Sequence, residues 1–301
     1  MQWFRGALLA LLMIMMALIS DYLGHQAYSW LPTPATVEAE AVGDLFSFLV
    51  TLGAMVFLAV MGVLTYTLIF YRAPKGDSTD AVPIRGNLKL EITWTVIPII
   101  LVMWIAGYSF VIYQRMNLIE NMPIVQFDSP LEAAAIAQTL TPSSRPTPEE
   151  IAVEVKQWAW TFYYPSYEVI SSTLHLPVNR RVHLKMRSQD VIHGFYVPNF
   201  RIKQDIVPNE TIDFSFTPNR VGKYELHDSQ FSGTYFALME ADVLVESVEE
   251  YEEWLDKTAK QQRTLAENKA HQEHGQPTQT KLRSRWHTVK PAEPNLVNPH
   301  Q

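Results

Sequence analysis

The sequence predicts a membrane-anchored, all-β protein: two membrane-spanning helices forming a helical hairpin, followed by one external domain of short strands. Two observations carry this prediction. The first half of the chain contains two long apolar segments without a charged side chain, and the second half changes to short runs in which apolar and polar residues alternate. The chain then ends in a polar tail.

An additional apolar run, Gly6 to Ser20, follows Arg5 and is shorter than the two that come later. Its length suits the apolar region of a signal peptide, although no clean small-x-small cleavage site follows it. Residues 1–24 are therefore predicted to be either a cleaved signal peptide or a retained anchor helix.

Two longer segments have the length of membrane spans. Leu45 to Tyr71 holds 27 residues and Ile92 to Tyr113 holds 22, and neither contains a charged side chain. At a rise of about 1.5 Å per residue, the shorter segment reaches about 33 Å, enough to cross a hydrocarbon core of about 30 Å. Residues 45–72 and 91–114 are therefore predicted to be transmembrane helices.

Basic residues crowd the short connection between these two spans, at Arg72, Lys75, Arg85 and Lys89. Positively charged loops stay on the cytoplasmic side of a membrane. Everything after Tyr113 is therefore predicted to lie on the opposite side.

The composition excludes two kinds of chemistry. The 301 residues include no cysteine, so the external domain has no disulfide and offers no thiolate to a metal. The net charge of -7 argues against a nucleic-acid partner.

The region after the second span divides into three parts. Residues 115–150 are predicted to be a linker, because they end in the run TLTPSSRPTPEE. Residues 151–247 alternate apolar and polar side chains, as in RRVHLKMRS and TIDFSFTP, which predicts six or more short strands in a small β-sandwich or barrel, with Ile151 to Tyr164 taken as the first strand. Residues 248–301 are predicted to be a short helix, from the spacing of Val248, Tyr251 and Leu255, and a disordered tail.

Several motifs carry a resemblance to a known family. The second span begins RGNLKLEITWTVIP, and the β-region contains, in order, VKQWAWTFYYP, DVIHGFYVPNFRIKQDIVPN, DFSFTPNRVGKYEL and, beyond the loop HDSQFSGTYFALM, YEEWL. From about Leu45 to Leu255 the chain resembles subunit II of the haem-copper terminal oxidases, the cytochrome c and quinol oxidases. The resemblance implies a cupredoxin-like external domain, the lipid bilayer as environment, and oxidase subunit I, together with subunit III, as partners.

The loop HDSQFSGTYFALM lies where the cytochrome c oxidases of this family bind a dinuclear copper centre, CuA. The resemblance places the two family cysteines at Asp228 and Ser232, the glutamate at Gln230 and the loop histidine at Phe236, while the outer ligands are matched by His193 and Met239. Both bridging thiolates are missing, and soft sulfur ligands are what a copper pair of this kind requires. CuA is therefore predicted to be absent, and the chain is predicted to hold no metal.

A weak single copper or zinc site is the alternative at this loop, with His193, Met239, His227 and Asp228 as ligands. Phe236 argues against it, because it presents an apolar ring where a ligand would be needed. The other interpretation of His193 and Met239 is that they are packed remnants of the former site.

The resemblance also implies two further roles. Glu91 matches the residue at the cytoplasmic mouth of a proton pathway into subunit I, although such a glutamate is otherwise a solvated residue at the edge of a span. Trp158 and Trp160 belong to the aromatic motif at which a protein electron donor docks, and apolar packing is the alternative for both.

The predicted function is subunit II of a haem-copper terminal oxidase that reduces oxygen to water with electrons from quinol. Quinol reaches the haems of subunit I from the bilayer and needs no copper in this chain, which would hold no cofactor and no catalytic centre. The sequence looks most like the alternative terminal oxidases of cyanobacteria, whose subunit II lacks the CuA ligands, and this places it in a bacterial plasma or thylakoid membrane with its C-terminal domain on the periplasmic or lumenal side. Two alternatives stay open: cytochrome c or another soluble carrier feeds the haems directly, or the chain is a membrane-anchored copper-binding or assembly factor.

Overall fold

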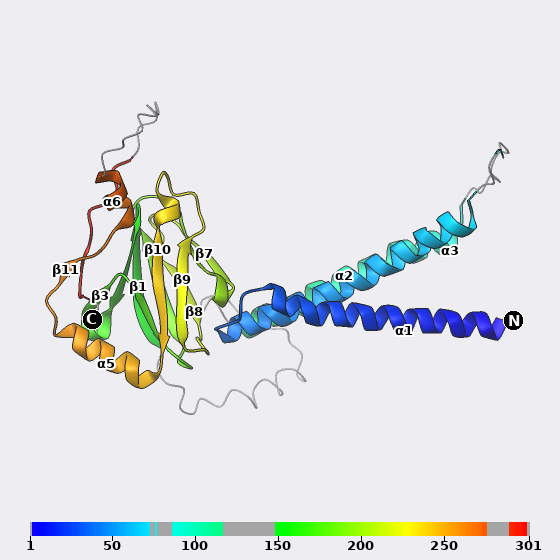
Figure 1. The fold of residues 1–301 in the computed structure, drawn as a ribbon, viewed down its shortest axis with the longest axis horizontal. Helices are drawn as coiled ribbons and strands as arrows, with labels where there is room; N and C mark the ends of the chain where they lie inside the picture. The colour runs from blue at the N-terminus through cyan, green and yellow to red at the C-terminus, as the bar shows by residue number, and fades with distance from the viewer. Residues whose placement is uncertain (1, 73–75, 77–85, 117–147, 276–288, 300–301) are drawn as a thin grey trace, which may run out of the picture. The chain divides into compact units, whose positions relative to one another are not determined.

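The computed structural model describes residues 2–72, 76, 86–116, 148–275 and 289–299 (Figure 1). The chain divides into two compact units, one of residues 1–33 and 41–115 and one of residues 34–40 and 116–301. The predicted linker, residues 115–150, lies almost wholly outside the described residues, as do Lys75 and Arg85.

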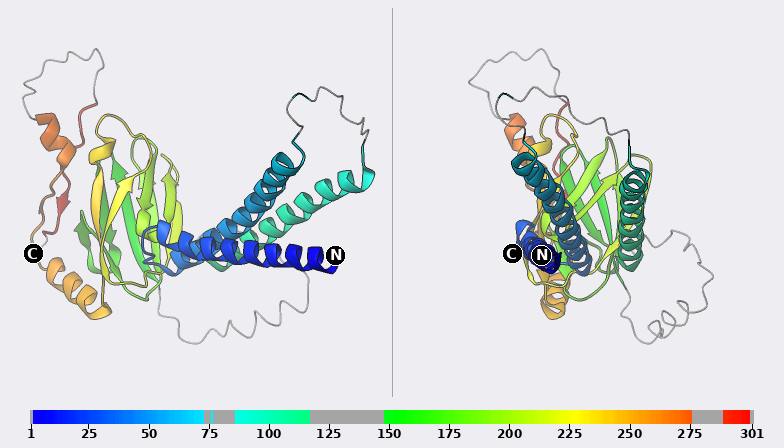
Figure 2. Two further views of the ribbon diagram at one scale, coloured as in Figure 1. Left: turned by 45° about the vertical axis from the view of Figure 1, so that its right-hand side comes forward. Right: turned by 90° about the vertical axis from the view of Figure 1, so that its right-hand side faces the viewer.

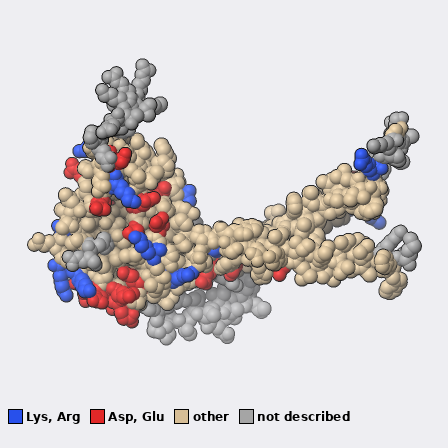
Figure 3. Space-filling view, in the orientation of Figure 1, with Lys and Arg blue, Asp and Glu red and all other residues tan. Residues whose placement is uncertain are grey.

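The first unit consists of long apolar helices. They are α1 (Gln2–Ala27), α2 (Val37–Phe70) and α3 (Leu88–Met116). Three segments, residues 6–30, 37–70 and 88–114, are long and apolar enough to cross a membrane, and the visible face of these helices is almost bare of charged side chains (Figure 3). The two predicted spans are thus present as α2 and α3, and the first apolar run, predicted as a signal peptide or an anchor helix, forms a third long helix that continues past Ser20 to Ala27.

Small and aromatic residues bring these helices together. Ser47 in α2 donates a hydrogen bond of 2.8 Å to the carbonyl oxygen of Gly24 in α1. A β-carbon on Gly24 would lie 1.8 Å from Thr51 Oγ1, so only glycine allows this approach. The residue that follows Ser47 in α2, Phe48, contacts Trp104 of α3, with ring centroids 5.2 Å apart.

Helices α2 and α3 each begin several residues earlier in the chain than the uncharged segment that predicts them. Thr36 caps α2, because its hydroxyl oxygen accepts a hydrogen bond of 3.0 Å from the amide of Ala39. Asn87 caps α3 by accepting from the amide of Lys89 at 3.1 Å. Polar caps of this kind determine where a helix begins. The length of an uncharged segment does not include them, so it underestimates the length of the helix.

The second unit is a sandwich of two five-stranded sheets (Figure 2). One sheet has the order β3-β2-β1-β5-β8, and the other has the order β4-β10-β9-β6-β7. The pairs β1–β5 and β4–β10 are parallel, and the others are antiparallel. The strands of the first sheet are β1 (Glu149–Lys156), β2 (Ala159–Tyr164), β3 (Val169–Ser171), β5 (Val182–Ser188) and β8 (Ile212–Phe216), and those of the second are β4 (Leu174–Pro177), β6 (His193–Val197), β7 (Ile202–Ile206), β9 (Gly222–Asp228) and β10 (Glu240–Glu246).

The alternation in the sequence places the apolar side chains between the two sheets. Leu184 and Met186 of β5 are fully buried together with Phe216 of β8. From the opposite sheet, Phe195 of β6 and Leu226 of β9 join the same core. The predicted β-sandwich is therefore present, and its core holds both sheets together.

The segment from Ile151 to Tyr164 is not the single strand that the alternation predicts. It contains most of β1 and all of β2, which pair in antiparallel fashion with Lys156 opposite Ala159. Gln157 and Trp158 form the turn between them. The alternation misses this turn because Trp158 is apolar and lies between two apolar strands.

The region after the sandwich is more ordered than predicted. The expected helix is α5 (Val248–Ala259), which buries Tyr251 and Leu255 and begins with a capping box between Ser247 and Glu250. The polar tail also contains β11 (Thr264–Leu265), α6 (Lys269–Gly275) and β12 (Leu296–Val297). The prediction of a disordered tail is thus wrong for these residues, while residues 276–288 lie outside the described residues.

Candidate functional site

The site is built around His193, the first residue of β6, whose side chain is 0% exposed. Strand β6 pairs with β9, and the register places Phe195 opposite Asp228. Asp228 ends β9 and begins a segment that we call the end loop, residues 228–239. The pairing of β6 with β9 therefore brings the start of the end loop to the buried histidine.

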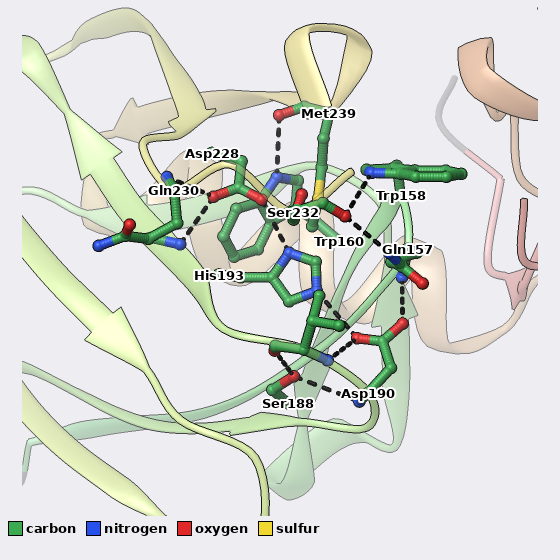
Figure 4. Close-up of polar contacts among 12 residues, drawn as sticks. Gln157, Trp158, Trp160, Ser188, Asp190, His193, Asp228, Gln230, Ser232 and Met239 are labelled. Atoms are coloured by element: carbon green, nitrogen blue, oxygen red, sulfur yellow. Dashed lines mark hydrogen bonds and ion pairs between the residues drawn. The ribbon is translucent and has the colours of Figure 1, made fainter. Parts of the chain in front are cut away.

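Two carboxylates hold the imidazole ring of His193 (Figure 4). Its Nδ1 lies 2.7 Å from Asp228 Oδ2, and its Nε2 lies 3.0 Å from Asp190 Oδ1. A neutral imidazole has one N–H, so both contacts are donated by the ring only when both nitrogens carry a proton. The geometry therefore favours an imidazolium between two carboxylates.

The pKa shifts of the three groups agree with this charge pattern. Burial lowers the pKa of His193, but the hydrogen bonds from its ring to Asp190 and Asp228 outweigh burial and raise the pKa above its usual value. For each aspartate, burial raises the pKa, and the bond from His193 together with backbone amides lowers it below the usual value. Each partner thus stabilises the charged form of the other.

Backbone amides satisfy the remaining carboxylate oxygens. Asp228 Oδ1 accepts from the amides of Gly194 at 2.7 Å and Gln230 at 3.0 Å. Asp190 accepts from the amide of Gln157 at 2.6 Å and from that of Val191 at 2.7 Å. These bonds connect β6, the end loop and the turn between β1 and β2.

The rest of the end loop is fixed by contacts with the same turn. The carbonyl oxygen of Ser232 accepts from Trp158 Nε1 at 3.1 Å and from Gln157 Nε2 at 2.7 Å. Gly233 has a φ of +115°, and a β-carbon there would lie 2.8 Å from Trp158 Cζ2. Glycine is therefore needed at this position for both its conformation and its size.

The other predicted site residues of the loop point in different directions. Met239 is 1% exposed, and its side chain points toward the cluster around His193 (Figure 4). Gln230 Nε2 donates to Asp205 Oδ1 at 2.9 Å, on the neighbouring strand β7. Phe236 packs against the core and contacts Phe231, with ring centroids 5.1 Å apart.

Trp158 and Trp160 are both buried, at 3% and 4% exposure. Trp158 contacts the ring of Tyr235, and the Tyr235 hydroxyl is 3.3 Å from His274 Nδ1 in α6. Trp160 Nε1 donates to the carbonyl oxygen of Met239 at 3.3 Å. Both indoles therefore donate hydrogen bonds to the backbone of the end loop and help to hold it in place.

Glu91 lies far from this loop in the sequence, in the first turn of α3. Its amide donates to the carbonyl oxygen of Asn87 at 2.9 Å, and its carbonyl oxygen accepts from the Thr95 hydroxyl at 2.9 Å. Both contacts involve backbone atoms of Glu91, so its side-chain carboxylate takes no part in them. The proton-pathway role of Glu91 stays a prediction.

Sequence reasoning missed the second carboxylate, Asp190, and the turn residue Gln157. The spacing of Asp190, three residues before His193, was the available signal, but it does not reveal the direction of either side chain. The sequence has no cysteine, and among residues 2–72, 76, 86–116, 148–275 and 289–299 no group of three or more His, Asp or Glu side chains is arranged to hold a metal ion.

Comparison with known proteins decides the family. A family model described as the transmembrane domain of cytochrome c oxidase subunit II matches residues 24–112, and one described as its periplasmic domain matches residues 169–248. Cytochrome c oxidase subunit 2 of Synechocystis sp. is 32% identical over 275 residues, which cover 83% of this chain and 82% of the relative. This chain belongs to the cytochrome c oxidase subunit II family.

The protein is accordingly subunit II of a haem-copper terminal oxidase, an integral membrane subunit with a periplasmic-type, cupredoxin-like domain. Quinol oxidase subunit 2 of Bacillus subtilis is 27% identical over 270 residues, covering 87% of this chain and 77% of the relative. Among solved structures, the periplasmic domain of subunit II of cytochrome oxidase of Bradyrhizobium japonicum is 23% identical with a TM-score of 0.35, covering 38% of this chain and 96% of that one. The Synechocystis relative is named after cytochrome c as electron donor, and the Bacillus relative is named after quinol.

Proposed function

We propose that this subunit II has no CuA centre and belongs to an oxidase that takes its electrons from quinol. One observation carries the proposal. Asp228, at the position of the first family cysteine, lies 2.7 Å from His193, at the position of an outer ligand. The two groups bind each other, which leaves neither available to a copper ion.

The residues at the other ligand positions are also unsuitable for a dinuclear copper centre. Ser232 and Gln230 supply a hydroxyl and an amide where the family has a thiolate and a glutamate, and Phe236 supplies an apolar ring. The Gln230 amide is already bonded to Asp205. Hard oxygen ligands of this kind do not replace the two bridging thiolates that a mixed-valence copper pair requires.

The surroundings of Trp158 argue against a soluble electron donor. Its indole is buried, and its N–H is bonded to the carbonyl oxygen of Ser232. The amide of Ala292, in the C-terminal segment, donates a hydrogen bond of 2.7 Å to the carbonyl oxygen of the adjoining Gln157. Because the indole is buried, a docking protein could contact its face only after the residues packed around it, such as Tyr235, had moved.

Quinol removes the need for a copper relay in this subunit. It is apolar, so it reaches the complex from the bilayer and delivers its electrons to the haems of subunit I. The β-sandwich then acts as a structural cap on the partner subunits, subunit I together with subunit III. We place this oxidase with the alternative oxidases of cyanobacteria; the similarity to the Synechocystis subunit, which is named a cytochrome c oxidase subunit, supports only the relationship to cyanobacterial oxidases.

The alternative of a separate copper-binding or assembly factor has less support. Such a factor would need exposed His and Met clusters in the external domain, whereas His193 and Met239 are both buried. The family match also covers the membrane helices as well as the sandwich. A subunit of the oxidase itself explains both parts.

The deciding experiment is oxygen consumption by the purified complex. Reduced quinol is offered in one measurement and reduced cytochrome c in another, with a CuA-containing cytochrome c oxidase as the control for the second donor. We expect turnover with quinol alone. Turnover with cytochrome c at a comparable rate would contradict the proposal and would mean that electrons cross the external domain without CuA.

A further inference from the structure

The end loop needs a cross-link to the sandwich. After Asp228, which ends β9, residues 229–239 contain one short 3-10 turn, Phe236–Leu238, and otherwise no regular structure. A metal ion bound by ligands from several segments can hold such a loop, because the free energy of binding then becomes free energy of folding. Without a metal, another interaction must join the loop to the strands beneath it.

The contacts of His193 provide such a junction. The ring comes from the start of β6, Asp228 from the start of the end loop, and Asp190 from the loop before β6. Asp190 also accepts from the amide of Gln157, in the turn between β1 and β2. One imidazole therefore connects β6 to the end loop, as a metal centre at this loop would, and through Asp190 it also reaches the turn between β1 and β2.

A buried ion pair stabilises a protein only when its geometry is good and its remaining polar atoms are satisfied. Both conditions hold here. The nitrogen-to-oxygen distances are 2.7 and 3.0 Å, and backbone amides of Gly194, Gln230, Gln157 and Val191 donate to the two carboxylates. The close packing of Gly194 shows how the loop is seated, since a β-carbon there would lie 2.1 Å from Ser229 Oγ.

We propose that Asp190, His193 and Asp228 form a charge latch that takes the structural place of the copper centre. The positively charged ring replaces the metal cations as the group to which the end loop is tied, so the subunit folds and holds its loop without copper. The latch also excludes metal, because a histidine that donates from both nitrogens has no lone pair left for a ligand bond. This inference concerns the chain alone and does not depend on which donor feeds the oxidase.

Limited proteolysis of the full-length chain in detergent tests the latch. Phe231 is 79% exposed and offers chymotrypsin a cleavage site within the end loop. We expect His193→Asn to raise the rate of cleavage in the end loop by about a hundredfold, because it leaves the buried carboxylate of Asp228 and the partly exposed carboxylate of Asp190 without their counter-charge. His183→Asn is the matched control: His183 lies on β5, in the sheet that does not contain His193, 3.1 Å from Asp213 of the neighbouring strand β8, and its replacement should leave the cleavage rate close to that of the wild type.

A double variant separates a charge latch from simple loss of packing. In His193→Asn with Asp228→Asn, the buried negative charge left by the first change is removed, so the double variant should be cleaved more slowly than His193→Asn alone. Additive or worse cleavage would overturn the latch. Asp190→Asn serves as a second, milder variant that keeps the folded chain available, because the Asp190 side chain is partly exposed.

Metal addition tests the second half of the proposal. Thermal unfolding of the same full-length chain is followed with a chelator, with Zn²⁺, with Cu²⁺ and with Cu⁺ under reducing conditions. The latch predicts the same midpoint temperature in all four conditions. A metal-dependent rise that disappears in His193→Asn would overturn it. The quinol assay is independent of these measurements, so failure of the latch and failure of the proposed donor can be told apart.

Discussion

Asn298 and Ile170 exchange two hydrogen bonds, one of which uses the side-chain oxygen of Asn298 as the acceptor. The amide of Ile170 donates to Asn298 Oδ1 at 3.0 Å, and the amide of Asn298 donates to the carbonyl oxygen of Ile170 at 2.8 Å. The Asn298 side chain also donates to the carbonyl oxygens of Thr258 and Gln261. One buried asparagine thus ties the C-terminal segment to β3 and to the end of α5.

We expect Asn298→Ala to lower the free energy of unfolding by about 1–3 kcal/mol, because the partly buried amide of Ile170 and two carbonyl oxygens lose their partner. Leu296→Ala is the control: this leucine is largely exposed in the same segment, and such surface changes usually stay within about 0.5 kcal/mol. Denaturant unfolding of both variants measures the difference. Equal values would mean that the C-terminal segment adds nothing to the stability of the domain.

A second prediction concerns Gly233. Its φ of +115° disfavours any other residue, and a β-carbon would come within 2.8 Å of Trp158. Gly233→Ala should therefore destabilise the protein by about 1–3 kcal/mol. Gly275→Ala is a matched control, since no atom lies within 4 Å of its β-carbon position. Thermal unfolding should separate the two variants, and an unchanged midpoint for Gly233→Ala would contradict the geometry of the loop.

The main fold was predictable because it depends on local properties of the sequence. The length of the segments without charged residues predicted two of the three long helices. The alternation of apolar and polar residues predicted the β-sandwich, because a two-residue period places all the apolar side chains on one face of a strand. For the first helix, the sequence did not distinguish a signal peptide from an anchor helix, because its apolar run is short when the flanking residues are not counted. The ordered parts of the tail were missed because Asn268 and Asn298 act as hydrogen-bonding partners, and composition alone counts them as polar residues typical of disorder.

The site was only half predictable. The resemblance identified His193 and Asp228 as former ligand positions, yet it could not show that they bind each other. That contact depends on the pairing of β6 with β9 and on the loop that brings Asp190 to the other ring nitrogen. Substitution of a thiolate by a carboxylate therefore looked like a loss in the sequence, whereas in the structure it supplies a new partner.

The charge pattern around His193 predicts how stability depends on pH. The pKa of His193 is raised from 6.5, so its contribution is complete below that value and is lost as the pH rises through the raised pKa. The pKa values of Asp190 and Asp228 are lowered from 3.8, so their contribution is present above that value and is lost as the pH falls through the lowered pKa values. The charge latch should therefore stabilise the fold most between these two pH limits.

The measurement is the midpoint of denaturant unfolding from acid to mildly alkaline pH, for the wild type and for His193→Asn. The difference between the two should be largest between about pH 4 and pH 6.5 and should shrink on both sides. His183→Asn again serves as the control. A difference that stays constant with pH would show that the imidazole contributes only packing.

The proposed proton route predicts an effect at Glu91. If its carboxylate receives protons at the cytoplasmic edge of α3, then Glu91→Ala should slow quinol-driven oxygen reduction in the assembled complex. Lys89→Ala, two residues earlier in the same turn, removes a charge without removing a proton carrier and should leave turnover unchanged. Equal rates in the wild type and the Glu91 variant would remove this residue from the pathway.

The last prediction distinguishes a structural Trp158 from one that receives electrons. Its ring is buried against Tyr235, and its N–H supports the end loop through Ser232. Trp158→Ala should therefore cost about 3–5 kcal/mol of stability, as large aromatic-to-alanine changes in a core do. Trp158→Phe keeps most of the ring but loses the hydrogen bond, and should cost about 0.5–1.5 kcal/mol through that bond.

The assembled complex then provides the decisive comparison. For a structural Trp158, the rate of oxygen reduction with quinol, measured per haem in correctly assembled enzyme, should be the same in Trp158→Phe and the wild type. A sharp fall in donor oxidation by Trp158→Phe, without a matching loss of stability, would show that electrons pass through this indole. The β-domain would then be an electron conductor, and the absence of bridging thiolates would require a different relay between Trp158 and the haems.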